Sequence, residues 1–396
     1  MAWVSVVGGG TARADVREDP GLLLGARSAI APGVTYREFS LRASHGPAYG
    51  HLLTIDLRER RVSVDLLYPG AVGARSAMSE LADRRRAVGA VNGDFFNITE
   101  TQHPGVEVTG APVGPAVAGG HALKAAVPDG QRFGPAMPSG VTTEDVLAVG
   151  TDRTARLDRL SLEGSVRTDD GDLPLSGFNQ YALPVDGIGA FTSAWGGTSR
   201  RRSTCGTDTR RSAPCTGDTY EVTVRGSRVV DTSRAPGRGT IPRGTTVLVG
   251  REEGARELRR LSIGDRVRIT QELRADRHDG IRCALGGFPL LRGGRPLPGL
   301  DGTASTVRTA AGLADHGRRL YLLALDGAVA YRSGLTVAEL ARTMRGLGAV
   351  DAFNLDGGGS STMVTRGRNS AHATVRNHPS GGAERPVPNG IGVFVG

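Results

Sequence analysis

The stretch AFNLDGGGSSTMV, at positions 352–364, places an amide and a carboxylate one residue apart before a run of glycine and serine. Asn354 and Asp356 share a face if residues 352–355 form a strand, because side chains alternate along a strand. Glycines lack a Cβ, so the backbone can turn sharply or lie against a ligand, and successive N–H groups can bind an anion. The residues of this run are Gly357, Gly358, Gly359 and Ser360. A glycine-rich hairpin turn would have the same composition, so this stretch alone leaves both interpretations open.

Three further polar clusters interrupt apolar parts of the chain, namely VNGDFFN at 91–97, STVRTAAG at 305–312 and NHPSGGAERPVPNG at 377–390. Together with the glycine run they offer carboxylates, amides and arginines, which suit an anionic sugar or a phosphate ligand. The residues concerned are Asn92, Asp94, Arg308, Glu384, Arg385 and Asn389. Structural roles are equally open: Asp94 could cap a turn, Arg308 could be a solvated strand residue, and Glu384 could pair with Arg385.

Several familiar site types do not fit these clusters. A P-loop needs Lys and then Ser or Thr after its glycines, and a nucleophile elbow needs Gly-x-Ser-x-Gly, whereas the run here reads GGGSST. No zinc-finger spacing, RNA-binding aromatic motif or dense basic helix occurs, so we expect no nucleic-acid partner. Asp and Asn side chains with loop carbonyls suit Ca²⁺, but the chain has no contiguous calcium loop. Calcium therefore stays an alternative cofactor, and the metal ligands stay unknown.

The elements that position these residues are mostly strands. HLLTIDL and RVSVDLLY alternate around a charged RERR turn, as hairpin strands do. SAMSELADRRRAVGAVNGDFF predicts a short helix followed by a buried strand over residues 87–92. The chain of 396 residues contains 59 glycines and 21 prolines, which indicates a loop-rich protein. We predict an α+β fold, a single large β-rich domain with a mixed sheet and few helices.

The C-terminal third predicts a β–α–β unit. RLYLLALDG is a strand that ends at Asp326, and the helix TVAELARTMRGLG begins with a capping box of Thr336 and Glu339. The next strand delivers Asn354 and Asp356, after which STMVTRG returns along the sheet. Asp326 and Asp356 therefore end two strands of one unit, where α/β folds often build sites.

The charge of the chain is strongly positive. The formal net charge is +9, and Lys124 is the only lysine. The arginines could reflect a GC-rich genome, or they could attract an anionic polymer, since a guanidinium pairs bidentately with phosphate. No apolar run approaches the roughly 20 residues that span a bilayer.

The N-terminus and the cysteines favour export. Residues 1–14 are apolar and small and end in Ala-Arg-Ala, as in the last part of a secretory signal, although a charged leading segment is missing. An ordinary N-terminus is the alternative. The simplest disulfide joins Cys205 to Cys215 and leaves Cys283 as a buried thiol, whereas a reducing compartment would leave three thiols. We expect a secreted or cell-envelope protein.

Seven segments occur together in a recognisable order: AVNGDFFN, GFNQY, LGGFPLL, TVRTAAGL, LYLLALDG, GLTVAELARTMRGLGAVDAFNLDGGGSSTMV and ERPVPNGIGVF. In this order the chain resembles the phosphodiester glycosidases, the family of lysosomal N-acetylglucosamine-1-phosphodiester α-N-acetylglucosaminidase. The resemblance covers residues 34–396. It implies a domain over residues 15–396, in which the Arg- and Ser-rich excursion at 196–218 looks like a surface insertion.

The resemblance implies hydrolysis of a sugar-1-phosphodiester at the sugar carbon. Asp356 is the first choice for the catalytic carboxylate, with Asp94, Asp326 and Glu384 as other candidates. Arg308 is expected to contact phosphate, helped by Arg385 and the Gly357–Gly359 backbone, while the candidate amides that orient sugar hydroxyls or carboxylates are Asn92, Asn354 and Asn389. The expected substrate is a sugar phosphodiester or an anionic envelope glycopolymer. Two alternatives stay open: a secreted non-catalytic binder of phosphate-rich envelope polymers, or a phosphodiesterase that cleaves the P–O bond.

Overall fold

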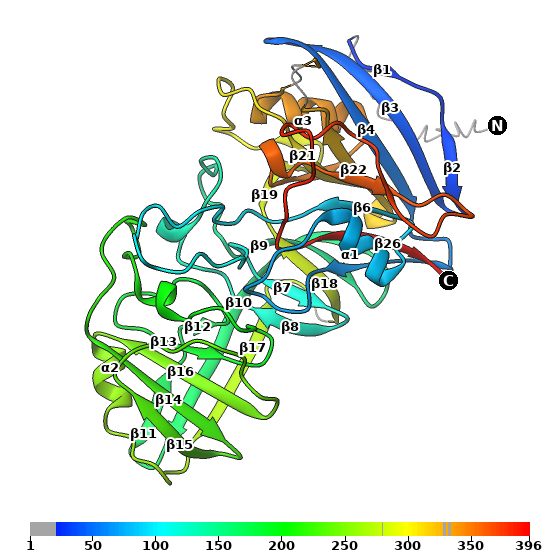
Figure 1. Ribbon diagram of the computed structural model, residues 1–396. Coiled ribbons are helices and arrows are strands. Elements are labelled where there is room, and N and C mark those ends of the chain that lie inside the picture. Colours follow the sequence, from blue (N-terminus) through cyan, green and yellow to red (C-terminus); the bar gives the residue numbers. More distant parts are fainter. Residues whose placement is uncertain (1–20, 279, 328–329, 332–333) are drawn as a thin grey trace, which may run out of the picture.

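The computed structural model describes residues 21–278, 280–327, 330–331 and 334–396, and within them the strands form four sheets (Figure 1). The expected export segment at 1–14 lies outside the described residues. Across the described chain the fold is β-rich with few helices, and it includes a mixed sheet, as the sequence predicts.

The largest sheet in this part of the chain has nine strands. In order they are β1 (Leu23–Leu24), β3 (Val34–Ala43), β4 (Gly46–Asp56), β22 (Arg319–Leu325), β21 (Thr309–Ala314), β23 (Asp351–Leu355), β19 (Phe288–Arg292) and β20 (Arg295–Pro296), with β2 (Ser28–Ala31) beside β3. A smaller sheet beside it contains β25 (Thr374–Val375), β24 (Met363–Thr365), β6 (Gly89–Asn92), β26 (Gly390–Val395) and β5 (Val62–Leu67).

Two more sheets come from the middle of the sequence. One contains β11 (Gly171–Pro174), β10 (Ala155–Thr168), β9 (Asp145–Gly150), β18 (Ile281–Gly286), β7 (Ala116–Ala118) and β8 (His121–Lys124), with β17 (Arg268–Ala275) beside β10. The other contains β12 (Gly177–Phe178), β13 (Ile188–Phe191), β16 (Thr245–Arg251), β14 (Thr219–Arg225) and β15 (Arg228–Ser233). Figure 1 shows this last sheet, in green, at the opposite end of the molecule from β1 and β3.

The helices of the described chain are short. The α-helices are α1 (Met78–Arg85), α2 (Glu253–Leu258) and α3 (Val337–Gly346), and the 3-10 turns are η1 (Asp129–Gln131), η2 (Arg201–Thr204), η3 (Asp315–Gly317) and η4 (Gly358–Ser360). The predicted capping box is present, because Thr336 accepts from Glu339 N and Glu339 accepts from Thr336 N. None of the helices described is both long and apolar enough to cross a bilayer.

The predicted β–α–β unit is confirmed. β22 and β23 are both antiparallel to β21, which lies between them, so they run parallel to each other with α3 as the crossover. α3 packs against β19 and β23, and the register joins Thr309 to Leu355. Asp326 and Asp356 therefore follow two strands that end at the same edge of the largest sheet.

The strand after the glycine run differs from the expectation. STMVTRG does not return along the same sheet, because β24 pairs with β6 in the smaller sheet. The chain crosses between two sheets at residues 356–362, and the polar clusters gather where the sheets meet. One large hydrophobic core, with members from Ile30 to Val393, connects these sheets, so they belong to a single large domain.

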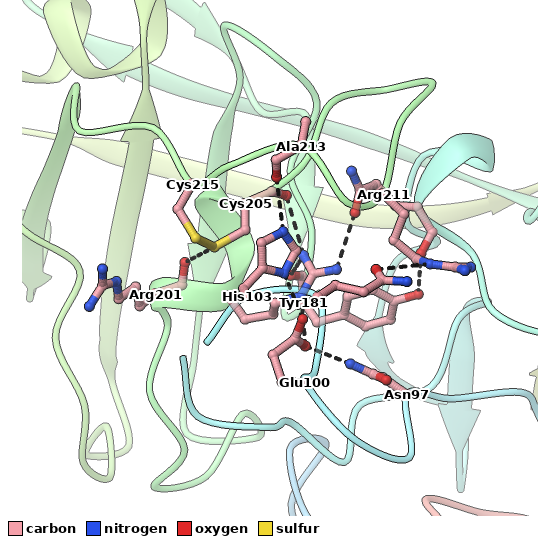
Figure 2. Close-up of polar contacts among 12 residues, drawn as sticks. Asn97, Glu100, His103, Tyr181, Arg201, Cys205, Arg211, Ala213 and Cys215 are labelled. Atoms are coloured by element: carbon pink, nitrogen blue, oxygen red, sulfur yellow. Dashed lines mark hydrogen bonds and ion pairs between the residues drawn. A yellow bond between two sulfur atoms is a disulfide. The ribbon is translucent and has the colours of Figure 1, made fainter. Parts of the chain in front are cut away.

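The segment expected as a surface insertion at 196–218 is only partly at the surface. Cys205 and Cys215 form the predicted disulfide, and Cys283 is a buried free thiol. Figure 2 shows Glu100 and His103 near the disulfide. Glu100 is 2.6 Å from His103 Nδ1, and it also accepts a hydrogen bond from Arg202 Nε (2.9 Å). Arg202 is 1% exposed, because its guanidinium finds a buried carboxylate partner. The sequence indicated a surface excursion here and gave no sign of a buried partner for Arg202.

Candidate active site

The candidate active site lies where β6, β23 and the chain entering β26 come together. Asp356 N donates to Gly93 O (2.8 Å), and Gly93 N donates to Asn389 O (3.0 Å). These two bonds bring the cluster around Asp94 beside those around Asp356 and Asn389, which lie more than 250 residues further along the sequence.

Asn92 locks this junction through its side chain. Its Nδ2 donates to Asp356 O (2.7 Å), and its Oδ1 accepts from Thr309 Oγ1 (2.9 Å) and Thr362 N (3.0 Å). These bonds use both lone pairs of Oδ1 and one of the two Nδ2 protons. Asn92 is buried and holds the strand ends together.

Asp94 occupies a close-fitting site built from glycines. Phe95 N donates to Asp94 Oδ1 (2.7 Å), and Gly114 N donates to Oδ2 (2.6 Å). A Cβ at Gly286 would lie 2.5 Å from Asp94 Oδ2, so a larger residue there would displace the carboxylate. This contact gives a physical reason for the first glycine in LGGFPLL, Gly286.

Two cations near Asp94 were not singled out as site residues by the sequence reasoning. Lys124 is fully buried, and its Nζ donates to Val113 O (3.2 Å) and to two further carbonyls. Burial raises the pKa of Asp94 and lowers the pKa of Lys124, while each charge favours the ionised form of the other. The Arg132 guanidinium lies 5.7 Å from the Phe95 ring centre, and its charge also lowers the pKa of Asp94. One feature of the sequence could have drawn attention to Lys124, because it is the only lysine of an arginine-rich chain.

Asp356 is partly open to solvent, and its pKa is strongly raised. The surrounding protein raises its pKa from 3.8 to about 7 by desolvation, and the nearby charge of Asp94 adds to the rise. A hydrogen bond with Ser360 and the charge of Arg385 oppose that rise. Arg385 Nη1 in turn donates to Ser360 Oγ (3.3 Å), so these three residues form one connected group.

The glycine run is a tight turn whose backbone is largely occupied. Gly358 N donates to Val307 O (2.8 Å), and the N–H groups of Ser360 and Ser361 close turns within the run. These three donors are used inside the protein, which reduces the anion nest expected from the sequence. Glycine is nevertheless required, because a Cβ at Gly357 would lie 2.4 Å from Val307 O and one at Gly359 would lie 2.3 Å from Arg385 Nη2.

The two candidate arginines are placed differently. Arg308 is buried, and it donates from Nε to Leu335 O (2.8 Å) and from Nη2 to Ala304 O (2.8 Å). Burial lowers the pKa of Arg308 to about 10. Its guanidinium therefore ties loops together, whereas Arg385 lies against the glycine run beside Asp356.

The two remaining carboxylates also have structural partners. Glu384 accepts from Ser79 N (2.9 Å) and Ser79 Oγ (2.5 Å) in the first turn of α1, where a negative charge complements the helix dipole. Asp326 accepts from His378 N (2.7 Å) and lies between two imidazoles, His51 and His378. Neither histidine was predicted as a site residue from the sequence, although His51 interrupts an alternating strand.

Several buried polar atoms in this region have no hydrogen-bond partner among the described residues. They are Asn354 Nδ2 and Oδ1, Asn389 Nδ2 and Thr362 Oγ1. Asn354 lies opposite Phe288, whose ring stacks on Phe95 next to Asp94. A buried amide without a hydrogen-bond partner costs folding free energy. A polar ligand that bonded to these atoms would remove that cost.

A large cavity lies elsewhere in the molecule. It has a volume of about 980 Å³ and is lined at one end by Ala314 and Asp351. These residues are at the ends of β21 and β23 opposite to Thr309 and Asp356. We place the site at the Asp94–Asp356 junction because the cavity contains none of the perturbed carboxylates, and its Arg58 and Arg156 are already paired with aspartates.

Comparison with known proteins gives a family match over part of the chain. Residues 218–394 match the phosphodiester glycosidase family, which confirms the resemblance over that part of the chain. The matched range contains Asp326, Asp356 and Arg385, whereas Asp94 precedes it. No curated protein matches the sequence.

Solved structures show the fold. A protein from Burkholderia pseudomallei has a TM-score of 0.72 at 20% identity, with 95% of this chain and 97% of that chain covered. A hypothetical protein from Synechocystis has a TM-score of 0.70 at 21% identity, and the alignment covers 92% of this chain but only 63% of that longer chain. The auto-inhibited catalytic domain of zebrafish N-acetylglucosamine-1-phosphodiester α-N-acetylglucosaminidase has a TM-score of 0.47 at 14% identity, covering 94% and 87% of the two chains. At these identities the first two structures establish the shared fold and not the activity.

Proposed function

We propose that the protein hydrolyses the glycosidic bond of sugar-1-phosphodiesters and releases a free sugar and a phosphomonoester. The observation that carries this proposal is the pair of neighbouring carboxylates, Asp94 and Asp356, whose pKa values are both raised at a junction that also holds Arg385. Perturbed carboxylates grouped in this way are typical of acid–base sites. The family match supports the substrate class.

The reaction does not need strong general-acid catalysis at the leaving group. The bond between the anomeric carbon and the phosphate oxygen breaks, and its electron pair stays on that oxygen. The product is a phosphate monoester whose second pKa is about 6, so it can leave without a strong general acid. Water adds to the anomeric carbon, and its proton passes to a carboxylate.

We assign the role of general base to Asp356. A pKa of about 7 lets it be ionised near neutral pH and still hold a proton, which is the range in which a base is most effective. Asp94 is held by two backbone N–H groups, so it serves better as a fixed negative charge beside the oxocarbenium-like transition state.

We assign phosphate binding to Arg385 and not to Arg308. Arg308 uses two donors on backbone carbonyls, whereas Arg385 lies at the glycine run and influences Asp356. A guanidinium there can accept the charge that develops on the departing phosphate. Asn354 and Asn389, with unpaired amide atoms, are the groups that we expect to bind sugar hydroxyls.

We further propose that the domain at 15–396 acts outside the cytoplasm, with residues 1–14 as part of an export signal. The disulfide between Cys205 and Cys215 supports this location, because such bonds persist in oxidising compartments. The substrate would then be a sugar phosphodiester or an anionic envelope glycopolymer, and the net charge of +9 is compatible with either.

The test is to incubate the protein with a panel of sugar-1-phosphodiesters and identify both products. We expect free sugar together with a phosphomonoester. Sugar phosphate and alcohol would instead show cleavage of the P–O bond, and binding without turnover would show a non-catalytic module. Either of these results would refute the proposal. Asp356→Asn serves as the inactive control.

A further inference from the structure

A cluster of two histidines and one aspartate lies beside the glycine run. Asp326 follows β22, His51 lies in β4, and His378 lies in the segment between β25 and β26. His51 Nε2 is 3.1 Å from Asp326 Oδ1, and His378 Nδ1 is 2.8 Å from the same oxygen. One ligand atom from each of the three residues lies within 4.8 Å of the other two.

The two separations from Asp326 Oδ1 match those between neighbouring ligands of a single metal ion. With bonds of roughly 2.0–2.1 Å to nitrogen and oxygen, ligand atoms lie about 3.0 Å apart in octahedral geometry and about 3.4 Å apart in tetrahedral geometry. The distances of 3.1 Å and 2.8 Å are close to the octahedral value. Hydrogen bonds have similar lengths, so the protons must also be counted.

The protons allow two arrangements around His51. The Tyr36 hydroxyl lies 2.7 Å from His51 Nδ1 and 3.3 Å from Glu38 Oε1. If the phenol donates to His51 Nδ1, Nε2 carries a proton and donates to Asp326 Oδ1. If the phenol donates to Glu38, Nδ1 carries the proton and Nε2 directs its lone pair toward the carboxylate. The second arrangement is the one in which Nε2 can bind a metal ion.

The surroundings meet the other requirements of a metal site. His51 and Asp326 are buried, at 4% and 3% exposure, while half of the His378 side chain is open to solvent and leaves a route for an ion. The second nitrogen of each histidine has a hydroxyl partner, Tyr36 for His51 and Tyr331 for His378 (3.2 Å). Such partners fix the ring and its tautomer in metal sites.

We propose that His51 Nε2, His378 Nδ1 and the Asp326 carboxylate bind one divalent transition-metal ion, such as Zn²⁺ or Co²⁺. Two imidazoles and one carboxylate suit these ions, whereas Ca²⁺ prefers oxygen ligands alone.

The ion would join β4 and the end of β22 to the segment that carries His378. Ser380, two residues further on, contacts Gly358 O (3.4 Å), and the same segment continues to Arg385 and Asn389. The metal would therefore hold the segment against the glycine run. This inference does not depend on the proposed hydrolysis.

The experiment uses the untagged full chain, freed of metal with a chelator. We expect calorimetry with ZnCl₂ to show one site, and Co²⁺ to give an absorption spectrum with nitrogen ligation. His378→Ala should weaken binding at least 100-fold, and because this side chain is half exposed the variant should still fold. The matched control is His372→Ala, an exposed histidine paired with Asp83 outside the cluster. It should leave binding unchanged.

Nitrogen-resolved NMR of the histidines provides a second measurement that needs no variant. One equivalent of Zn²⁺ should move the signals of His51 Nε2 and His378 Nδ1 and leave His372 unchanged. No binding at one equivalent would overturn the proposal and leave a shared proton as the explanation of the short contacts. Binding of equal affinity in His378→Ala, or shifts confined to other histidines, would overturn it as well.

Discussion

Asp356→Asn is expected to stabilise the protein at neutral pH while it removes activity. The folded protein raises the pKa of Asp356 from 3.8 to about 7, a difference of about three pH units. At about 1.4 kcal/mol per unit, the ionised carboxylate costs up to about 4 kcal/mol of folding free energy. This figure is an upper limit, because part of the Asp356 surface reaches solvent.

The pH dependence follows from where the proton resides. Between about pH 4 and pH 7 the folded state keeps a proton that the unfolded state has released, so the wild-type protein loses stability as the pH rises through this window. The amide of the variant does not titrate. The two proteins should therefore unfold at similar denaturant concentrations at pH 4, and the variant should be more stable by several kcal/mol at pH 8.

Activity should change in the opposite direction. If ionised Asp356 is the base, kcat/KM of the wild type should rise with pH and level off above about pH 7, and the variant should lose at least 100-fold. Asp351→Asn is the matched control. It lies at the other end of β23 and can still accept the hydrogen bond from Gly293 N. This control should leave kcat/KM unchanged.

Two results would contradict these expectations. Equal stability of Asp356→Asn and wild type at both pH values would show that the carboxylate is not destabilised by its surroundings. Activity within a few-fold of wild type, in a folded variant, would remove Asp356 from the catalytic step.

Three further changes test the site and its support. Arg385→Lys should lower turnover about 100-fold because an ammonium cannot reproduce a bidentate contact with phosphate, whereas Arg308→Lys should mainly lower the melting temperature, and the reverse pattern would return the phosphate role to Arg308. Gly357→Ala should destabilise the protein by several kcal/mol in denaturant unfolding, because the new Cβ would lie 2.4 Å from a backbone carbonyl oxygen; normal stability would mean that the turn can relax. Replacing both Cys205 and Cys215 by Ser should cost about 3 kcal/mol in the loop-entropy model, and unchanged stability would show that the bridge does not restrain the unfolded chain.

The sequence predicted the local features that depend on short spacing. The capping box of α3, the β–α–β unit and the disulfide follow from residues near one another in the chain, and all three are present. Asp94, Asp356 and Asn389 lie in segments that contact one another, and their action as one site stays a prediction.

What the sequence could not predict depends on long-range pairing. Whether an arginine points to a ligand or to a carbonyl is decided by distant loops, as with Arg308 and Leu335 O. The hydrogen-bond partner of Glu384 is Ser79 in α1, which is 305 residues away in the sequence. Lys124 is buried beside Asp94 where separate sheets pack together. The periodicity of the sequence does not predict contacts between sheets.

Both sheets that build the site combine strands from distant parts of the chain. β4 pairs with β22, and the register of β5 with β26 joins Leu67 to Gly390. Closing such long loops costs conformational entropy before the stabilising contacts form. Folding of this architecture is therefore slow compared with that of a protein built from local contacts. On the ribosome, β5 stays an unpaired edge until β26 has emerged, which exposes apolar strand surface to aggregation for most of synthesis. Folding yield, and not only native stability, should therefore respond to chaperones and to the rate of synthesis.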